Sequence, residues 1–152
     1  MPHELKRILL AEDNANDLEL TLAALQASRL ANEVIVVRDG AEALDWLFRR
    51  GRFADRYDDL PALVLLDLKM PKVDGLEVLR QIKSDARLRL TPVVMLTASR
   101  EESDLIRSYQ MGVNAYVVKP VEFAAFMEAV RQLGAFWAVV NETPPTVPVG
   151  AI

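Results

Sequence analysis

The chain has 152 residues, of which 51% are hydrophobic and 26% charged, so it is long and apolar enough to bury one globular core without disulfides. It contains no cysteine, which excludes thiolate catalysis and thiolate metal sites, and its net charge of -4 disfavours direct nucleic-acid binding. The N-terminal segment lacks the apolar region of a signal peptide, and no stretch approaches the roughly 18 consecutive apolar residues of a membrane span. We therefore expect a cytoplasmic protein with no membrane partner.

Five short apolar segments alternate with five segments of helical periodicity. Strands are expected at residues 7–11, 34–37, 62–66, 92–96 and 115–118. Helices are expected at residues 15–30, 41–50, 75–86, 101–111 and 121–138, with Asp39 as a helix cap and Gly112 after the fourth helix. Such alternation is typical of βαβ units, whose right-handed crossovers place helices on both faces of a parallel sheet. The predicted fold class is therefore α/β, with a doubly wound parallel sheet.

Polar side chains follow four of the expected strands at their carboxyl ends. These side chains are Glu12 and Asp13 after the first strand, Asp67 after the third, Thr97 after the fourth and Lys119 after the fifth. Open α/β sheets bind ligands in the crevice outside these strand ends. In a sheet with strand order 2-1-3-4-5, all five side chains converge on one pocket.

The residue types in this pocket favour a hard cation and phosphoryl chemistry. Three neighbouring carboxylates raise one another's pKa unless a cation is bound, and oxygen ligands without His or Cys favour Mg²⁺. The Lys119 ammonium and the Thr97 hydroxyl are donors suited to phosphoryl oxygens. A carboxylate between Mg²⁺ and a lysine is a credible nucleophile toward phosphorus, so the pattern predicts an aspartyl phosphate on Asp67.

Four sequence motifs together resemble the receiver domain of two-component response regulators. They are Glu12-Asp13, the run LLDLKMPKVDG at residues 65–75, TAS at 97–99 and AYVVKP at 115–120. The resemblance covers residues 6–138 and implies a flavodoxin-like (βα)5 fold that accepts a phosphoryl group from a histidine kinase. It also implies a signalling switch without an output domain, which catalyses only its own phosphorylation and dephosphorylation and is otherwise not an enzyme.

The same resemblance assigns roles to individual residues. It implies that Glu12, Asp13, Asp67 and the backbone carbonyl of Lys69 hold Mg²⁺, that Lys119 contacts the phosphoryl group, that Thr97 and Tyr116 form a coupled switch, and that the Lys119-Pro120 peptide is cis. We also hypothesise that the Lys69 side chain tunes the lifetime of the phosphate.

The end of the chain carries more apolar surface than one helix face needs. Phe136, Trp137, Val139 and Val140 continue the apolar run of the last helix, and a proline-containing segment follows. We divide the chain into a receiver domain at residues 1–138 and a C-terminal arm at 139–152, for which dimerisation and folding back over the sheet edge are the two interpretations. This ending and the charged segment 51–61 resemble the phytochrome-associated response regulators, which implies a phytochrome-type kinase and a homodimer with exchanged arms.

Several other functions fit the sequence less well. A phosphohydrolase of the haloacid dehalogenase type needs a second acid two residues after the nucleophile, and that position is Lys69. Nucleotide and flavin sites need a loop that attracts phosphate after the first strand, where Glu12 and Asp13 repel it. A chemotaxis-type receiver that binds a motor and a pseudo-receiver that has lost phosphotransfer remain as alternatives.

Overall fold

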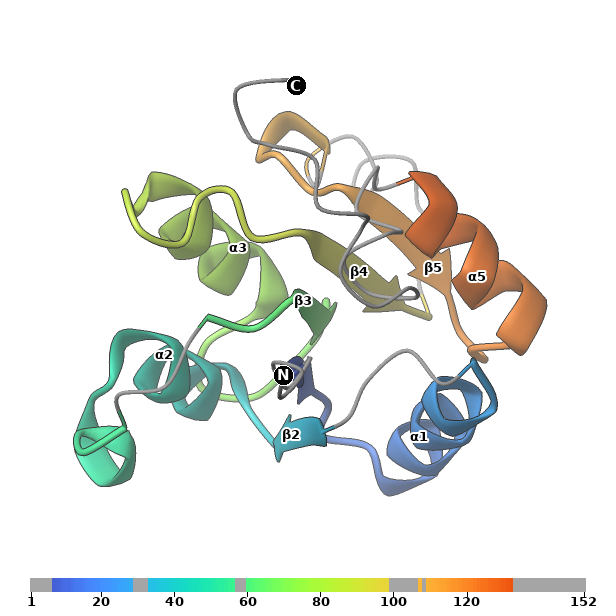
Figure 1. Ribbon diagram of the computed structural model, residues 1–152, viewed down its shortest axis with the longest axis horizontal. Helices are drawn as coiled ribbons and strands as arrows, with labels where there is room; N and C mark the ends of the chain where they lie inside the picture. The colour runs from blue at the N-terminus through green and yellow to red at the C-terminus, as the bar shows by residue number, and fades with distance from the viewer. Residues whose placement is uncertain (1–6, 29–32, 57–59, 99–106, 108, 133–152) are drawn as a thin grey trace, which may run out of the picture.

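A single parallel β-sheet forms the centre of the protein in the computed structural model, which describes residues 7–28, 33–56, 60–98, 107 and 109–132 (Figure 1). Its strands are β1 (Arg7–Ala11), β2 (Glu33–Val37), β3 (Leu63–Asp67), β4 (Val93–Thr97) and β5 (Ala115–Val118). They lie in the order β2-β1-β3-β4-β5, and every neighbouring pair is parallel. The α/β fold class and the strand order are confirmed.

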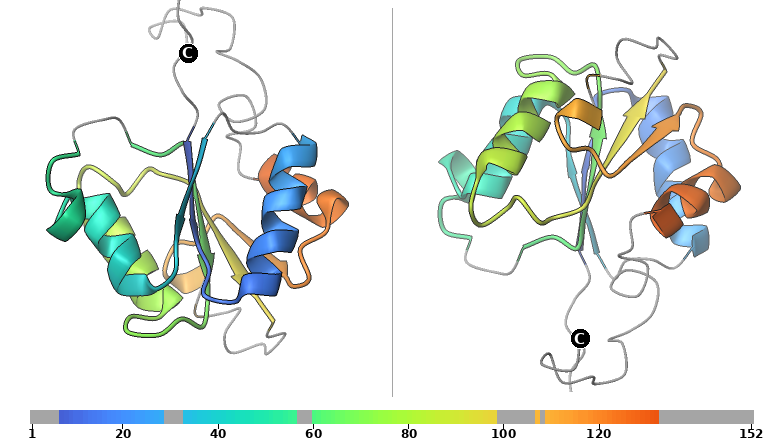
Figure 2. Two further views of the ribbon diagram at one scale, coloured as in Figure 1. Left: turned by 90° about the horizontal axis from the view of Figure 1, so that it is seen from below. Right: turned by 90° about the horizontal axis from the view of Figure 1, so that it is seen from above.

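Helices cover both faces of this sheet. They are α1 (Ala15–Ser28), α2 (Gly40–Phe48), α3 (Gly75–Ser84) and α5 (Phe123–Gln132), with a short 3-10 helix η1 (Gly51–Phe53) after α2. Figure 2 shows α2 and α3 on one face and α1 and α5 on the other. Most of the helix expected at residues 101–111 lies outside the described part of the chain, as do the boundary at residue 138, the whole arm, and the apolar residues Phe136, Trp137, Val139 and Val140.

Each strand contributes to two separate cores because successive side chains point to opposite faces. On β1, Leu9 and Ala11 pack in the cluster beneath α2 and α3, whereas Ile8 and Leu10 pack in the cluster beneath α1 and α5. The strand therefore shows the near-continuous apolar run typical of a sheet buried on both faces. No helix in the described ranges is long and apolar enough to cross a membrane.

Two helices end earlier in the structure than the sequence predicts. The second helix was expected to reach Arg50, but Arg49 adopts a left-handed conformation with a φ of 56°, which ends α2 at Phe48. The third was expected to reach Ala86, but Asp85 is extended, and α3 ends at Ser84. The carboxylate of Asp85 instead accepts hydrogen bonds from the next turn of the chain, which competes with continuation of the helix.

Candidate functional site

The acidic residues at the ends of β1 and β3 meet at one edge of the sheet. One carboxylate oxygen each from Glu12, Asp13 and Asp67 lies within 4.8 Å of the other two. Glu12 and Asp67 are buried, whereas Asp13 is exposed. The pairing of β1 with β3, in which Ala11 lies beside Leu66, brings these residues together across more than 50 positions of sequence.

The ammonium group of Lys119 lies among these acids. Its Nζ is 2.7 Å from Glu12 Oε1, 3.2 Å from Asp67 Oδ2 and 3.1 Å from Asp17 Oδ2. Burial alone lowers the pKa of Lys119, but hydrogen bonding to Glu12 and Asp17 and the charge of Asp67 outweigh it, so the pKa is raised. Lys119 is therefore a permanent cation inside the acidic site.

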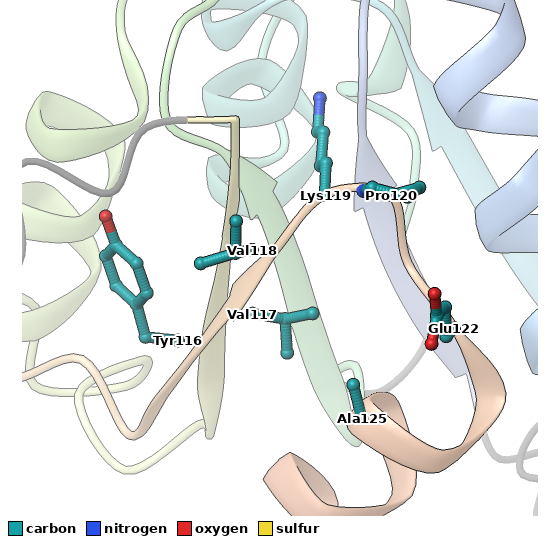
Figure 3. A pocket seen from close by; sticks show the side chains of 7 residues that line it. All are labelled: Tyr116, Val117, Val118, Lys119, Pro120, Glu122 and Ala125. Carbon is teal, nitrogen blue, oxygen red and sulfur yellow. The ribbon is translucent and has the colours of Figure 1, made fainter.

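The loop after β5 directs this lysine. The Lys119 amide donates to the Thr97 carbonyl at 2.7 Å, and the following Lys119-Pro120 peptide is cis, as expected. A hollow of about 310 Å³ lies beside this loop, lined by Tyr116, Val117, Val118, Lys119, Pro120, Glu122 and Ala125. In Figure 3 the Lys119 ammonium points away from the hollow, so the hollow and the acidic site are separate places.

Asp67 is an unusual carboxyl group. Burial is the main cause that raises its pKa, and the hydrogen bond and negative charge of Glu12 raise it further. The positive charge of Lys119 lowers it, but the net result is a pKa of about 8. A bound cation would lower this pKa, because it stabilises the ionised form of Asp67.

The acid pair after β1 is fixed by main-chain contacts. The Arg38 guanidinium, at the end of β2, donates from Nε to the Glu12 carbonyl and from Nη2 to the Asp13 carbonyl, each at 3.1 Å. The Glu12 amide donates to the Val37 carbonyl at 3.0 Å. This role of Arg38 could not be predicted from the sequence, because a charged residue after an edge strand carries no signal of a backbone contact with another loop.

The end of β3 and the loop after it pack against two glycines. A Cβ added to Gly75 would overlap the carbonyl oxygen of Asp67, and one added to Gly40 would overlap the carbonyl of Val73. Only glycine permits backbones to approach this closely. The start of α3 is fixed further by Asp74, whose side chain accepts from the Glu77 amide. The helix therefore begins directly against the residue that carries the central carboxylate.

The remaining predicted site residues take different positions. Thr97 is fully buried at the end of β4, next to the end of β3. Tyr116 is half-buried on β5, and its ring packs partly against the cluster beneath α2 and α3. Lys69 is exposed, while its amide donates to Asp67 Oδ1 at 3.3 Å. The switch role of Thr97 and Tyr116, the carbonyl ligand at Lys69 and the tuning role of its side chain stay predictions.

The donor set fits a hard divalent cation. Glu12 Oε2 accepts from the Asn14 amide at 3.2 Å, and the buried Glu12 Oε1 lies 2.7 Å from Lys119 Nζ. A buried carboxylate of this kind is stabilised by a further cation where other acids lie close to it. With two further carboxylates beside it and no nitrogen or sulfur ligand in the cluster, the site suits Mg²⁺ or Mn²⁺.

Comparisons with known proteins agree with this geometry. Residues 8–131 match the family profile of the response regulator receiver domain. The probable methanogenesis regulatory protein FilR2 of Methanothrix harundinacea is 42% identical over 137 residues, covering 90% of this chain and 86% of its own. The solved bacteriophytochrome response regulator RtBRR is 64% identical, with a TM-score of 0.83 over 93% of this chain and 86% of its own. The Mn²⁺-bound form of response regulator Rcp1 is 38% identical, with a TM-score of 0.74 over 92% and 99%.

Proposed function

This chain belongs to the response regulator receiver family, and from that premise we propose that it accepts a phosphoryl group on Asp67 and signals through changed binding to other proteins. The observation that carries the proposal is the position of the Asp67 carboxylate, which belongs to an acid cluster able to hold a cation and also lies 3.2 Å from the ammonium of Lys119. Apart from catalysing its own phosphorylation and dephosphorylation, the protein acts on no substrate in this proposal.

The chemistry is an in-line phosphoryl transfer. A carboxylate oxygen of Asp67 attacks the phosphorus of a phosphohistidine, the new O–P bond forms, and the P–N bond breaks with its electron pair left on the imidazole nitrogen. Lys119 stabilises the phosphoryl oxygens as negative charge moves between donor and acceptor. When bound by Glu12, Asp13, Asp67 and the Lys69 carbonyl, Mg²⁺ supplies positive charge that keeps the acceptor ionised and offsets the charge of the phosphoryl group.

The proposed switch couples the site to a protein-binding surface. The buried Thr97 hydroxyl donates to the phosphoryl group, and Tyr116 becomes more buried as Thr97 turns. The two residues lie on neighbouring strands, with Thr97 beside Val118 in the pairing of β4 with β5. A change at the end of β4 can therefore reach the half-buried face of β5 over a short path.

The kinase partner in this proposal is of the phytochrome type. Support comes from the 64% identity to a solved bacteriophytochrome response regulator over 93% of this chain. The test is phosphotransfer from a panel of autophosphorylated histidine kinases, followed at short times by loss of label from each kinase. We expect a phytochrome-type kinase to be the fastest donor to the wild-type chain, and no transfer to Asp67→Asn. Transfer at equal rates from unrelated kinases would contradict the assignment of the partner.

Dimerisation by the arm at residues 139–152 belongs to the same proposal, and it rests on the apolar run Phe136, Trp137, Val139 and Val140. Truncation after Ala135 should convert a dimer into a monomer at micromolar concentration, measured by light scattering. An unchanged mass would contradict the arm as the dimer contact. It would leave the chemotaxis-type alternative, a receiver without such an arm, as the better description.

A further inference from the structure

Asp17 is an acidic residue at the site that the metal cluster does not include. Its Oδ2 lies 3.1 Å from Lys119 Nζ and accepts a hydrogen bond from it, across 102 positions of sequence. The cation-holding group consists of Glu12, Asp13 and Asp67. Asp17 therefore approaches the lysine from the side of α1, whereas the carboxylates of the cation-holding group approach it from the strand ends.

The first turn of α1 holds Asp17 in place. The Asn14 side chain caps the helix by accepting from the Asp17 amide at 2.9 Å. The backbone carbonyl of Asn14 accepts from the Leu18 amide at 2.9 Å. A carboxylate in the first turn of a helix is stabilised by the partial positive charge of the free amides there. The Asp17 side chain is 28% exposed and that of Lys119 only 7%, so the two form the partly solvated wall of the site.

The other two partners of Lys119 are shared with the cation. Glu12 and Asp67 both contact the ammonium, but both also contribute oxygens to the acid cluster. A divalent cation in that cluster competes with the ammonium for the same lone pairs. Asp17 is the contact that such a cation leaves in place, because it is not part of the cluster.

The geometry of an ammonium group gives this contact a consequence for phosphoryl transfer. Lysine has three N–H donors on a flexible stem, and each bound acceptor reduces the directions left to the others. With one donor directed at Asp17, two remain for an Asp67 oxygen and for an oxygen of an incoming phosphoryl group. Among the described residues, Asp17 is the only side chain outside the metal cluster that contacts this ammonium. Without Asp17, the ammonium of a metal-loaded protein has no fixed partner left.

We propose that Asp17 is a positioning residue that holds the Lys119 ammonium at the phosphoryl site when the cation is bound. The inference rests on the proposed function, since it concerns the same acceptor and the same lysine. It predicts that loss of the Asp17 carboxylate slows the phosphorylation of Asp67. An ion pair that only joined α1 to the loop after β5 would change stability and leave the rate unaltered.

The test compares Asp17→Ala and Asp17→Asn with the wild-type chain. Asp17→Asn keeps a neutral acceptor at the same place, and Glu19→Gln is the matched control, because Glu19 is an exposed acid on the same helix. The rate constant for phosphoryl incorporation from acetyl phosphate is measured by intact mass, at Mg²⁺ concentrations that saturate each variant and at a temperature where circular dichroism shows each one folded. Saturation removes any effect of the substitution on metal affinity from the comparison.

We expect Asp17→Ala to be about tenfold slower, as for loss of one charge-assisted hydrogen bond at a partly exposed position. Asp17→Asn should recover part of the loss, and Glu19→Gln should match the wild type. A second readout is the ¹⁵N–¹H signal of the Lys119 ammonium in Mg²⁺-loaded protein, assigned by its absence in Lys119→Arg. It should be present in the wild type and broadened or lost in Asp17→Ala.

The outcomes separate this inference from the proposed function. If the wild-type chain takes up phosphoryl and Asp17→Ala takes it up at the same rate or faster, the positioning role is overturned and the phosphoryl-accepting function stands. If the wild-type chain takes up none, the proposed function fails and the positioning role fails with it. If Asp17→Ala does not fold, the rates of Asp17→Asn and the wild type decide: equal rates overturn the positioning role.

Discussion

Lys119 and Asp67 lie close together at the carboxyl edge of the sheet, with Nζ 3.2 Å from Oδ2 and both side chains 7% exposed. The same ammonium contacts Glu12 and Asp17, so one cation stands among several acids. This lysine lies 2.7 Å from the buried Glu12 carboxylate, and its removal leaves that carboxylate without a neighbouring cation among the described residues.

Replacement of this lysine should be costly when no metal is present. Lys119→Met should lower the free energy of unfolding in EDTA by about 3 kcal/mol, because breaking a buried ion pair leaves an uncompensated charge. Urea unfolding measured with EDTA and then with excess Mg²⁺ should show that the metal recovers part of this loss. Lys72→Met is the control, since Lys72 is exposed and pairs with Asp39 at 3.4 Å. Equal stability of Lys119→Met and the wild type in EDTA would contradict the charge balance described here.

The pH dependence of stability should report the raised pKa of Asp67. Burial and Glu12 raise this pKa from 3.8 to about 8 in the folded, metal-free protein, so its protonated form contributes stability that is fully present below about pH 4 and is lost as the pH rises through 8. The wild type in EDTA should lose up to about 1.4 kcal/mol per pH unit across that window. Asp67→Asn, which stays neutral, should lose much less. Parallel stability curves for the two proteins would contradict the raised pKa.

The same group should couple metal binding to proton release. Because Asp67 is mostly protonated below pH 8 and a metal ligand must be ionised, Mg²⁺ has to displace a proton there. Titration calorimetry at about pH 7 in buffers of different ionisation enthalpy should show release of nearly one proton per Mg²⁺. The apparent Kd should rise by up to about tenfold for each pH unit below that pKa. Binding that is independent of both buffer and pH would exclude Asp67 as a protonated ligand.

Much of the fold was predictable from the sequence because the strands are buried on both faces. The runs at β1, β4 and β5 read as short apolar segments, and each ends in a polar residue that marks the carboxyl edge of the sheet. Helix ends were less predictable, since Arg49 ends α2 by adopting a left-handed conformation that its sequence context does not signal.

The site was predictable where a side chain follows a strand directly, and missed where the contact comes from elsewhere. Glu12, Asp13, Asp67 and Lys119 follow strand ends, so topology alone brings them together. Asp17 reaches Lys119 from the first turn of a helix, and Arg38 reaches the backbone of another loop. Such contacts depend on side-chain direction and loop geometry, which periodicity does not encode.

Gly75 is a further position whose importance appears only in three dimensions. Gly75→Ala should destabilise the protein by about 3 kcal/mol or more, because the added methyl group overlaps the Asp67 carbonyl and the backbone of α3 must shift. The shift should also weaken Mg²⁺ binding, measured by calorimetry. Gly51→Asn is the control. Gly51 has a φ of 57°, which asparagine tolerates, and a Cβ added there would lie 3.3 Å from its nearest neighbour, an oxygen of the Asp45 side chain. A Gly75→Ala protein as stable as the wild type would show that Gly75 is not tightly packed against the backbone of Asp67.

The most direct test of the whole account is the intact mass of the wild-type chain and of Asp67→Asn after incubation with acetyl phosphate, with and without Mg²⁺. We expect one phosphoryl group to be added to the wild-type chain in the presence of Mg²⁺, and none to Asp67→Asn or to either protein in EDTA. No addition to the wild type, or equal addition to Asp67→Asn, would contradict Asp67 as the acceptor and favour a pseudo-receiver that acts by binding alone.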